Sequence, residues 1–398
     1  MKRVLHYLIL ATVLLGTPLA CCLLGGYDEI LEGVKQFPPR TEDWGFHPEK
    51  LWNVRHPFNW WWFSGFTLFT VACLFPFLRR GFRRLRRSVD LTIEQSEQSN
   101  KPNNRTIRTI EQSNNPNSFP LWGWAGLALL IISWVVAWSR FPCFTRYQQA
   151  ILSYFPVWTG YIVFINAVVK WRKGTCPLTE HPWLYLATFP ASSLFWWFFE
   201  YLNRYVWNWY YLGIENFTPF QYTFYASICF ASVLPAVYAT AEFLGTFRFF
   251  DDRNYDDMAW RPNVRSPVSC CVLAVLSAVG LAGIVYFPDY VYLFLWVSPL
   301  MVFVLVQILL REPCILDRLA SGAWGLVFRW EVAALCCGLC WETWNYYALA
   351  KWVYAVPWVH AFQIWEMPLI GFAGYLPFGV ECAAVTYWIY SGASESRS

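Results

Sequence analysis

Two glutamates with matching neighbours are the residues best suited to acid–base chemistry. Glu200 is followed three positions later by Asn203, and Glu342 is followed in the same way by Asn345. A carboxyl group near hydrocarbon costs roughly 3 kcal/mol, so it is kept mainly where it faces a cavity or a partner. An amide three residues further along a helix lies on the same face and could hold that carboxyl in a fixed geometry. We therefore expect both acid–amide pairs to be catalytic, with each glutamate as a general acid.

Aromatic and polar residues that follow these pairs are expected to bind the substrate. Each pair is followed by a Trp-x-Tyr segment and then by a Phe-Gln dipeptide, and a further acid falls in the middle of an apolar block. The predicted binding residues are Trp209, Tyr211, Trp352, Tyr354, Gln221, Gln363 and Glu381. The alternative is a structural role, in which the glutamates and asparagines cap interfacial helices and hydrogen-bond one another across the molecule.

The two sets of candidate residues belong to an internal repeat. A shift of the chain against itself by 142 positions aligns 200–235 with 342–377. The identical pairs are Glu200 and Glu342, Asn203 and Asn345, Tyr205 and Tyr347, Phe220 and Phe362, Gln221 and Gln363, Ile228 and Ile370, Phe230 and Phe372, Ala231 and Ala373, Leu234 and Leu376, and Pro235 and Pro377. Such self-similarity at a fixed spacing indicates a tandem duplication. Between each acid and the following apolar block we predict a short interfacial helix, since Trp and Tyr favour the membrane surface.

The composition indicates that membrane helices must position these residues. Of the 398 residues, 57% are hydrophobic and only 14% are charged, which excludes a soluble, fibrous or disordered chain. Blocks long enough to cross about 30 Å of hydrocarbon are predicted as helices, because a helix pairs its own backbone groups there. We count ten such blocks, at 4–23, 57–78, 119–138, 150–169, 184–202, 221–243, 267–287, 291–310, 324–342 and 368–390. The predicted fold is an all-α polytopic membrane protein.

The distribution of positive charge predicts the orientation of these helices. With the N-terminus inside, 21 of the 30 Lys and Arg residues fall on cytoplasmic segments and 8 on outer segments. This asymmetry is typical of inserted membrane proteins, whose cytoplasmic loops are enriched in basic residues. Both termini are then cytoplasmic, and the expected location is a bacterial inner membrane. The first block also resembles a secretory signal with a poor cleavage box, so its removal stays an open alternative.

Two N-terminal helices are predicted to precede two four-helix repeats. Because each repeat crosses an even number of times, both point the same way, which predicts a pseudo-two-fold axis along the membrane normal. The predicted units are an N-terminal region 1–87 with an outer loop 24–56, a disordered cytoplasmic linker 88–118, a first repeat 119–243, a cytoplasmic loop 244–266, a second repeat 267–390 and a cytoplasmic tail 391–398.

The residues that bind metals, nucleotides or nucleic acids do not form recognisable patterns here. Cys337-x-x-Cys340 has no second pair, and the five histidines are scattered. No nucleotide-binding motif is present. The only dense basic run, 79–87, abuts an apolar block and indicates a membrane anchor. We therefore expect no metal, no cofactor and no nucleic acid, and a membrane lipid or apolar small molecule as the partner.

The stretch from Glu200 to Tyr225 resembles the membrane-embedded lycopene cyclase domain family of bacteria and archaea. The resemblance rests on an acid, a Trp-x-Tyr segment nine residues later, then Leu-Gly-Ile and Pro219, on tandem helical repeats. It implies an enzyme of carotenoid biosynthesis that protonates a polyene. The positions of the family's paired acids hold Gln221, Tyr222, Gln363 and Ile364. The resemblance then implies that protons would come from Glu200, Glu342 or Glu366.

These observations favour a protein that binds or modifies an isoprenoid-like or carotenoid-like lipid in an intramembrane pocket. A proton-coupled transporter or channel is the alternative, since parallel repeats, proline-kinked spans and the mid-span Glu381 also occur in carriers. Most of the predicted spans lack the polar stripe that a carrier of hydrophilic solutes needs. A non-catalytic membrane assembly subunit is a third alternative. Whether the chain is an enzyme stays open at this point.

Overall fold

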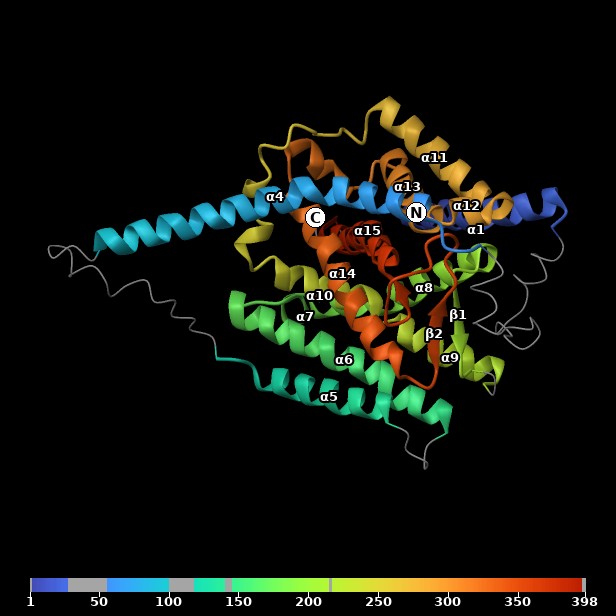
Figure 1. The fold of residues 1–398 in the computed structure, drawn as a ribbon, viewed down its shortest axis with the longest axis horizontal. Coiled ribbons are helices and arrows are strands. Elements are labelled where there is room, and N and C mark those ends of the chain that lie inside the picture. Colours follow the sequence, from blue (N-terminus) through green and yellow to red (C-terminus); the bar gives the residue numbers. More distant parts are fainter. Residues whose placement is uncertain (1, 28–55, 100–117, 140–144, 215–216, 396–398) are drawn as a thin grey trace.

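The structure, a computed structural model, describes residues 2–27, 56–99, 118–139, 145–214 and 217–395, and these are mostly helical (Figure 1). The first half contains α1 (Lys2–Gly25), α4 (Trp60–Ser99), α5 (Leu121–Trp138), α6 (Arg146–Lys173), α7 (Pro177–Glu180), α8 (Pro182–Val206), α9 (Pro219–Phe230) and α10 (Val233–Leu244). The second half contains the 3₁₀ turns η2 (Arg248–Phe250) and η3 (Asp252–Asn254), then α11 (Pro267–Tyr286), α12 (Pro288–Val291), α13 (Phe294–Leu309), η4 (Ile315–Ser321), α14 (Trp324–Tyr346), η5 (Leu369–Gly374) and α15 (Tyr375–Glu395). The predicted all-α class is confirmed.

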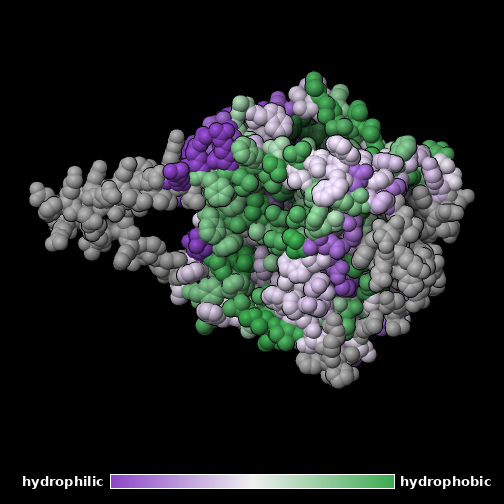
Figure 2. Space-filling view, in the orientation of Figure 1, coloured by the Kyte–Doolittle hydropathy of each residue, from purple (hydrophilic) through white to green (hydrophobic). Residues whose placement is uncertain are grey.

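Eight helical segments among the described residues are long and apolar enough to cross a membrane. Helices also cover the ten predicted blocks, but α8 and α13 are not among the eight. The sequence of α8 is rich in Trp, Tyr and Ser, and α13 has only 16 residues. A multi-pass membrane architecture is thus supported by helix length and composition, and the count of ten stays a prediction. In Figure 2, apolar side chains cover much of the visible face, and hydrophilic side chains gather where α4 leaves the body.

Local sequence signals define the ends of α6. Thr145 accepts a hydrogen bond from the Gln148 backbone N–H, and the Gln148 side chain accepts one from the Thr145 N–H, which is a capping box. At the other end Gly174 adopts a left-handed φ of 85°, which glycine tolerates without steric cost. Lys170 and Lys173 lie in the last turn, where positive charge favours the helix C-terminus.

Glycines allow α5 and α6 to pack closely along each other (Figure 1). A Cβ atom on Gly160 of α6 would lie 2.8 Å from the Gly126 carbonyl oxygen of α5 and would also meet the backbone nitrogen of Leu130. Backbone atoms cannot move aside as a flexible side chain can. Small residues at such crossings are typical of membrane helices, where close van der Waals packing holds the helices together.

Substitution of Gly160 by alanine is therefore expected to separate α5 from α6 and to lower the free energy of unfolding by about 1–3 kcal/mol, as overpacking does. The measurement is thermal unfolding of the purified protein in a mild non-ionic detergent. Gly16→Ala in α1 is the matched control, because a Cβ there meets no atom within 4 Å. Equal stability of the two variants would show that the α5–α6 crossing tolerates the extra carbon.

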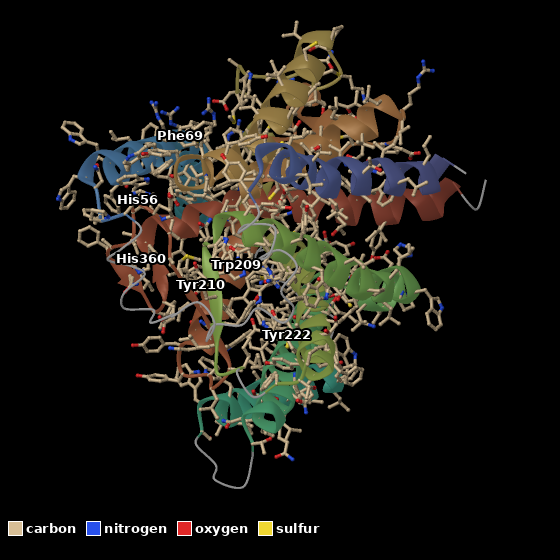
Figure 3. All side chains as sticks on the ribbon, turned by 90° about the vertical axis from the view of Figure 1, so that its right-hand side faces the viewer. His56, Phe69, Trp209, Tyr210, Tyr222 and His360 are labelled. Carbon is tan, nitrogen blue, oxygen red and sulfur yellow. The ribbon has the colours of Figure 1, made fainter. Side chains whose placement is uncertain are left out.

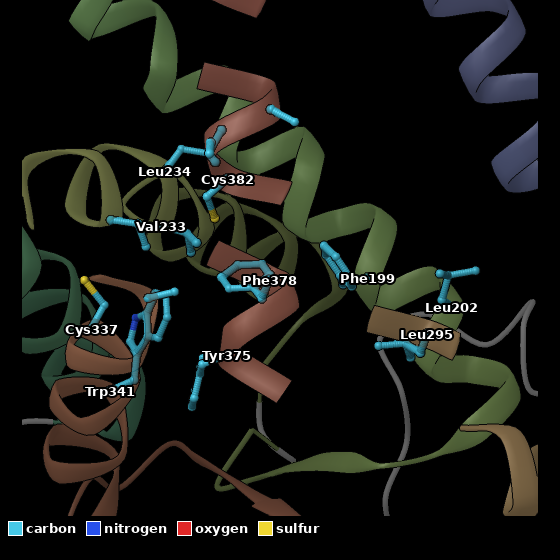
Figure 4. Close-up of a cluster of buried hydrophobic side chains, with 14 of the residues drawn as sticks. Phe199, Leu202, Val233, Leu234, Leu295, Cys337, Trp341, Tyr375, Phe378 and Cys382 are labelled. Carbon is cyan, nitrogen blue, oxygen red and sulfur yellow. The ribbon is translucent and has the colours of Figure 1, made fainter. Parts of the chain in front are cut away.

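The main apolar core joins helices of both halves of the chain. Phe199 of α8, Leu234 of α10, Leu295 of α13, Cys337 of α14 and Phe378 of α15 are all fully or almost fully buried in it (Figure 4). The rings of Phe199 and Phe378 meet edge to face, with centroids 5.7 Å apart. The core thus places the ends of α8 and α14, which carry the candidate acids, against a common interior.

Short strands, and not interfacial helices, follow α8 and α14. β1 (Trp209–Leu212) pairs antiparallel with β2 (Lys351–Tyr354). Our prediction of helices was wrong because each segment is too short to be stable as an isolated helix, whereas the two segments together satisfy one another's backbone groups. The left-handed φ of 78° at Gly213 turns the chain directly after β1, close to the Leu349 carbonyl.

Aligned positions of the repeat differ in structure beyond these strands. Residues 219–230 form α9, but the positions 142 further on form the hairpin β3 (Gln363–Ile364) and β4 (Met367–Pro368), followed by η5. Pro368 stands where α9 has Ala226. A proline inside a helix removes a hydrogen bond and clashes with the preceding turn, which disfavours a helix like α9 in the second copy.

The predicted boundaries of the N-terminal region can be compared with the structure only where its residues are described. α4 continues to Ser99 and so enters the segment 88–118 that we predicted as a disordered linker. Residues 100–117 of that linker and residues 28–55 of the predicted outer loop lie outside the described residues. The division into domains stays a prediction.

Candidate functional site

Asn203 fixes the chain where it leaves α8. That helix ends at Val206, and Trp207 adopts a left-handed φ of 58° while its N–H donates to the Asn203 carbonyl at 2.7 Å. The Asn203 side-chain oxygen accepts hydrogen bonds from the N–H groups of Asn208 at 2.8 Å and Trp209 at 3.4 Å. Its amide donates to the Trp209 carbonyl at 2.8 Å. One buried side chain thus pairs three backbone groups at the start of β1.

Asn345 has the same function at the start of the second strand. Its amide donates to the Trp352 carbonyl at 2.8 Å, and its oxygen accepts from the Trp352 N–H at 2.9 Å. Within the described residues, no hydrogen bond joins Asn203 to Glu200 or Asn345 to Glu342. The asparagines therefore position the strands, and not the carboxyl groups as we had predicted.

The strand pairing brings the two Trp-x-Tyr segments side by side. Trp209 lies opposite Tyr354, and Tyr211 lies opposite Trp352. In the repeat, Trp209 corresponds to Trp352 and Tyr211 corresponds to Tyr354. If each residue of the first pair is replaced by its counterpart, the second pair results, so the register is two-fold symmetric. Figure 3 shows Trp209 and Tyr210 on β1, with Tyr222 further along the same side of the molecule.

Glu200 accepts three hydrogen bonds on one carboxyl oxygen. The donors to Oε1 are Trp196 Nε1 at 3.1 Å, Trp209 Nε1 at 3.0 Å and the Tyr211 hydroxyl at 2.5 Å. The residue is only 4% exposed, and the positive charge of Arg204, one turn further along α8, acts on it. This carboxyl is thus surrounded by donors and has a neighbouring cation.

Glu342 also has three donors, but it lacks a counter-charge. Its Oε1 accepts from the hydroxyls of Tyr354 at 2.7 Å and Tyr375 at 3.2 Å, and from Trp352 Nε1 at 3.4 Å. The residue is fully buried, and its Oε2 has no hydrogen-bonding partner among the described residues. No Lys, Arg or His in the described part of the chain lies within ion-pair distance of it. A buried carboxyl group in this state is costly unless it is protonated or a ligand compensates it.

The third hydrogen-bond donor to the carboxyl group comes from a different position of the repeat in each half. In the first half it is Trp196 of α8, and the position 142 further on is Gly338. In the second half it is Tyr375 of α15, and the position 142 earlier is Val233. A Cβ on Gly338 would collide with the Tyr375 ring, so the glycine makes room for that ring. An indole from one helix and a phenol from another thus complete equivalent carboxyl sites.

All six donors line one aromatic pocket between the halves. The cavity volume is about 110 Å³, and the pocket is partly open to the surroundings. The other aromatic residues of its wall are Tyr154, Tyr222, Tyr225, Phe230, Trp296 and Trp341. Glu200 and Glu342 do not line the pocket themselves; they lie behind the rings that hydrogen-bond to them. Any occupant therefore meets aromatic faces first, and the carboxyl groups act on it through those rings.

Three of the predicted binding residues lie away from this wall. Gln221 closes a capping box at the start of α9, where its Oε1 accepts from the Thr218 N–H at 2.9 Å. Gln363 is exposed on β3 and lies 2.7 Å from Nε2 of His360, a residue whose pKa burial lowers to about 4. Glu381 is buried within α15, with 2% of its surface exposed. Of the seven predicted binding residues, the structure brings together the four aromatic ones.

Sequence reasoning missed several residues of the pocket. Trp196 lies four positions before Glu200 on one helix face, a spacing at which side chains meet, so this contact had a recognisable signal. Tyr375 and Trp296 had none, because they come from α15 and α13. Within the described residues, no group of three or more His, Cys, Asp and Glu side chains is arranged to hold a metal ion.

Comparisons of this chain with protein-family models, with curated proteins and with solved structures found no match. The aromatic pocket and the two carboxyl groups behind it are therefore the features from which a function can be inferred.

Proposed function

We propose that this chain is a multi-pass membrane protein that holds an apolar lipid, of the isoprenoid or carotenoid kind, in the aromatic pocket. The observation that carries the proposal is that all six hydrogen-bond donors around two buried carboxyl groups line this one pocket. Because their polar hydrogens are paired with the carboxyl groups, these rings offer mainly carbon surface to an occupant. Flat, unsaturated hydrocarbon chains complement such a wall by stacking and by burial of apolar surface.

The same wall has the groups for proton transfer. The hydroxyls of Tyr211 and Tyr354 line the pocket and hydrogen-bond to Glu200 and Glu342. With the carboxyl group protonated, the phenol would give its proton to a double bond and regain one from the carboxyl group behind it. A different proton lost from the resulting cation would return through the phenol to the carboxylate, which completes an isomerisation or cyclisation. The resemblance to the lycopene cyclase domain favours chemistry of this kind, without the paired acids of that family.

Two parallel repeats in a bacterial inner membrane, with both termini cytoplasmic, form part of the proposal. The symmetric register of β1 and β2 supports a two-fold axis between the halves, since equivalent strands related by such an axis must pair antiparallel. The unequal distribution of Lys and Arg supports the orientation. With the axis along the membrane normal, the strands would lie flat near the outer surface, where Trp and Tyr are favoured.

The test is expression in a host that makes lycopene or other polyprenyl compounds, followed by extraction and mass spectrometry of the purified protein. We expect an apolar unsaturated compound to co-purify. Glu200→Gln and Glu342→Gln should keep this compound, because glutamine still offers an oxygen to the aromatic donors. If the chain converts the compound, we expect the conversion to fall by at least about 100-fold, as for loss of a general acid.

Absence of any bound apolar compound in all hosts would contradict the proposal. Proton-driven uptake of a hydrophilic solute into proteoliposomes, abolished by Glu381→Gln, would instead identify a transporter. If the wild type and both variants retain the compound but none converts it, the protein binds the lipid without catalytic activity.

A further inference from the structure

Four indole rings from four different elements line the pocket and pack against one another. Trp196 belongs to α8, Trp209 to β1, Trp296 to α13 and Trp341 to α14. Their centroids lie between 5.6 Å and 6.5 Å from those of their neighbours. The face of an aromatic ring carries partial negative charge, and Trp has the strongest attraction for cations among the aromatic residues. A wall that contains four neighbouring indoles is therefore complementary to a positively charged group that reaches the ring faces.

The carboxyl groups behind the rings strengthen this preference. An indole or phenol that donates its hydrogen to a carboxylate gains electron density on its face, and the carboxylate adds a negative potential. At Glu200, Arg204 offsets part of that potential. At Glu342 the described residues offer neither a cation nor a donor to Oε2. An ionised Glu342 would therefore have no balancing charge among the described residues unless a cation occupied the pocket.

The remaining groups of the wall also favour a cation of a particular type. Among the described lining residues only Lys351 is charged, and its ammonium is already paired with Glu366 at 2.5 Å. The aromatic donors point to the carboxyl groups, which lie behind the rings and out of reach. The other polar groups of the described wall are mainly the hydroxyls of Tyr154, Tyr222 and Tyr225, which are uncharged and replace the water around a primary ammonium ion only in part. A cation without N–H groups and with an apolar surface needs no such replacement.

We infer that the pocket binds a quaternary ammonium group, carried by a lipophilic molecule. This inference rests on the proposed lipid-binding function and adds the charge of the bound group to it. The same chemistry occurs in the choline headgroup of a membrane lipid and in small free quaternary amines. In both cases the methyl groups would contact the faces of Trp196, Trp209, Trp296 and Trp341, and Glu342 would supply the counter-charge through Tyr354 and Trp352.

A matched pair of probes tests the inference. The purified full chain in a non-ionic detergent is titrated with octyltrimethylammonium and, separately, with its uncharged isostere in which carbon replaces nitrogen. Binding is followed by quenching of tryptophan fluorescence and by calorimetry. We expect the cation to bind at least about tenfold more tightly than the isostere, since several desolvated cation–π contacts contribute together. We expect Glu342→Gln to remove most of this preference, and Glu331→Gln on the same helix to keep it.

The outcomes separate this inference from the proposed function. Equal binding of the two probes to the wild type would overturn the inference while keeping an apolar pocket, and binding of neither would contradict the proposed function itself. The wild-type comparison decides the matter even if Glu342→Gln fails to fold. Competition by choline alone would indicate a free quaternary amine as the ligand. Competition only by phosphatidylcholine vesicles, and not by phosphatidylglycerol vesicles, would indicate a lipid headgroup.

Discussion

Replacement of Asn203 by alanine is expected to lower the free energy of unfolding by about 3–5 kcal/mol. The side chain pairs three backbone groups at the junction of α8 and β1, and each buried polar group left unpaired costs about 1–3 kcal/mol. Alanine can replace none of these bonds, and the loss should be only partly offset by water entering the space. Thermal unfolding in detergent, followed by tryptophan fluorescence, measures the effect as a lower midpoint temperature.

Two further variants make this result specific. Asn203→Asp keeps the acceptor for the Asn208 and Trp209 N–H groups but loses the donor to the Trp209 carbonyl, so we expect an intermediate loss. Asn263→Ala is the control, because Asn263 is exposed and its side chain accepts only a hydrogen bond from the Arg265 N–H. If Asn203→Ala were as stable as Asn263→Ala, the asparagine would not be what holds β1 in place.

Leucine in place of Gly374 is expected to exclude the lipid that we propose for the pocket, with little loss of stability. Gly374 lines the pocket, and a Cβ there would meet only the Trp296 ring, at 3.8–4.0 Å, which is ordinary contact. Its backbone is not in the left-handed region, so a larger residue brings no strain there. The added side chain would occupy space that the lipid needs. We expect the amount of co-purifying lipid to fall at least about tenfold, which corresponds to only about 1.4 kcal/mol.

Gly65→Leu provides the matched control for this variant. Gly65 lies in α4 with no atom within 4 Å of a Cβ, so leucine there changes the apolar surface of the protein but not the pocket. The ratio of lipid to protein, measured by mass spectrometry after gel filtration, should stay at the wild-type value for Gly65→Leu. An unchanged ratio for Gly374→Leu as well would place the lipid elsewhere on the molecule.

The acids and their aromatic partners could be found from the sequence because each set occurs twice at nearly the same spacing. Glu200 with Trp209 and Tyr211, and Glu342 with Trp352 and Tyr354, hydrogen-bond as sets in the structure. Hydrophobic blocks likewise predicted the helices, because their length is set by the membrane thickness. Sets of residues that occur in both copies of the repeat could thus be predicted, because the same combination at the same spacing rarely recurs by chance.

Other features had no signal in a single sequence. The pairing of β1 with β2 joins segments about 140 residues apart, and each is too short for an alternating pattern to be distinctive. The exchange of Trp196 for Tyr375 as third donor is invisible to an alignment of the halves, because the two residues occupy different positions of the repeat. The Asn-Trp contacts depend on the left-handed turn at Trp207, a conformation that non-glycine residues adopt only in a specific tertiary context.

The hydrogen-bonded seam between β1 and β2 limits how this molecule can move. Many carriers alternate access by rocking one half against the other about a central site. Here the main chains of the two halves are joined at the pocket, and the asparagines anchor each strand to its own helix. Rocking would shear this ladder in every cycle, so the seam disfavours that kind of motion. Met367, Gly371 and Gly374, from the segment between β3 and the end of η5, lie at the wall beside this seam.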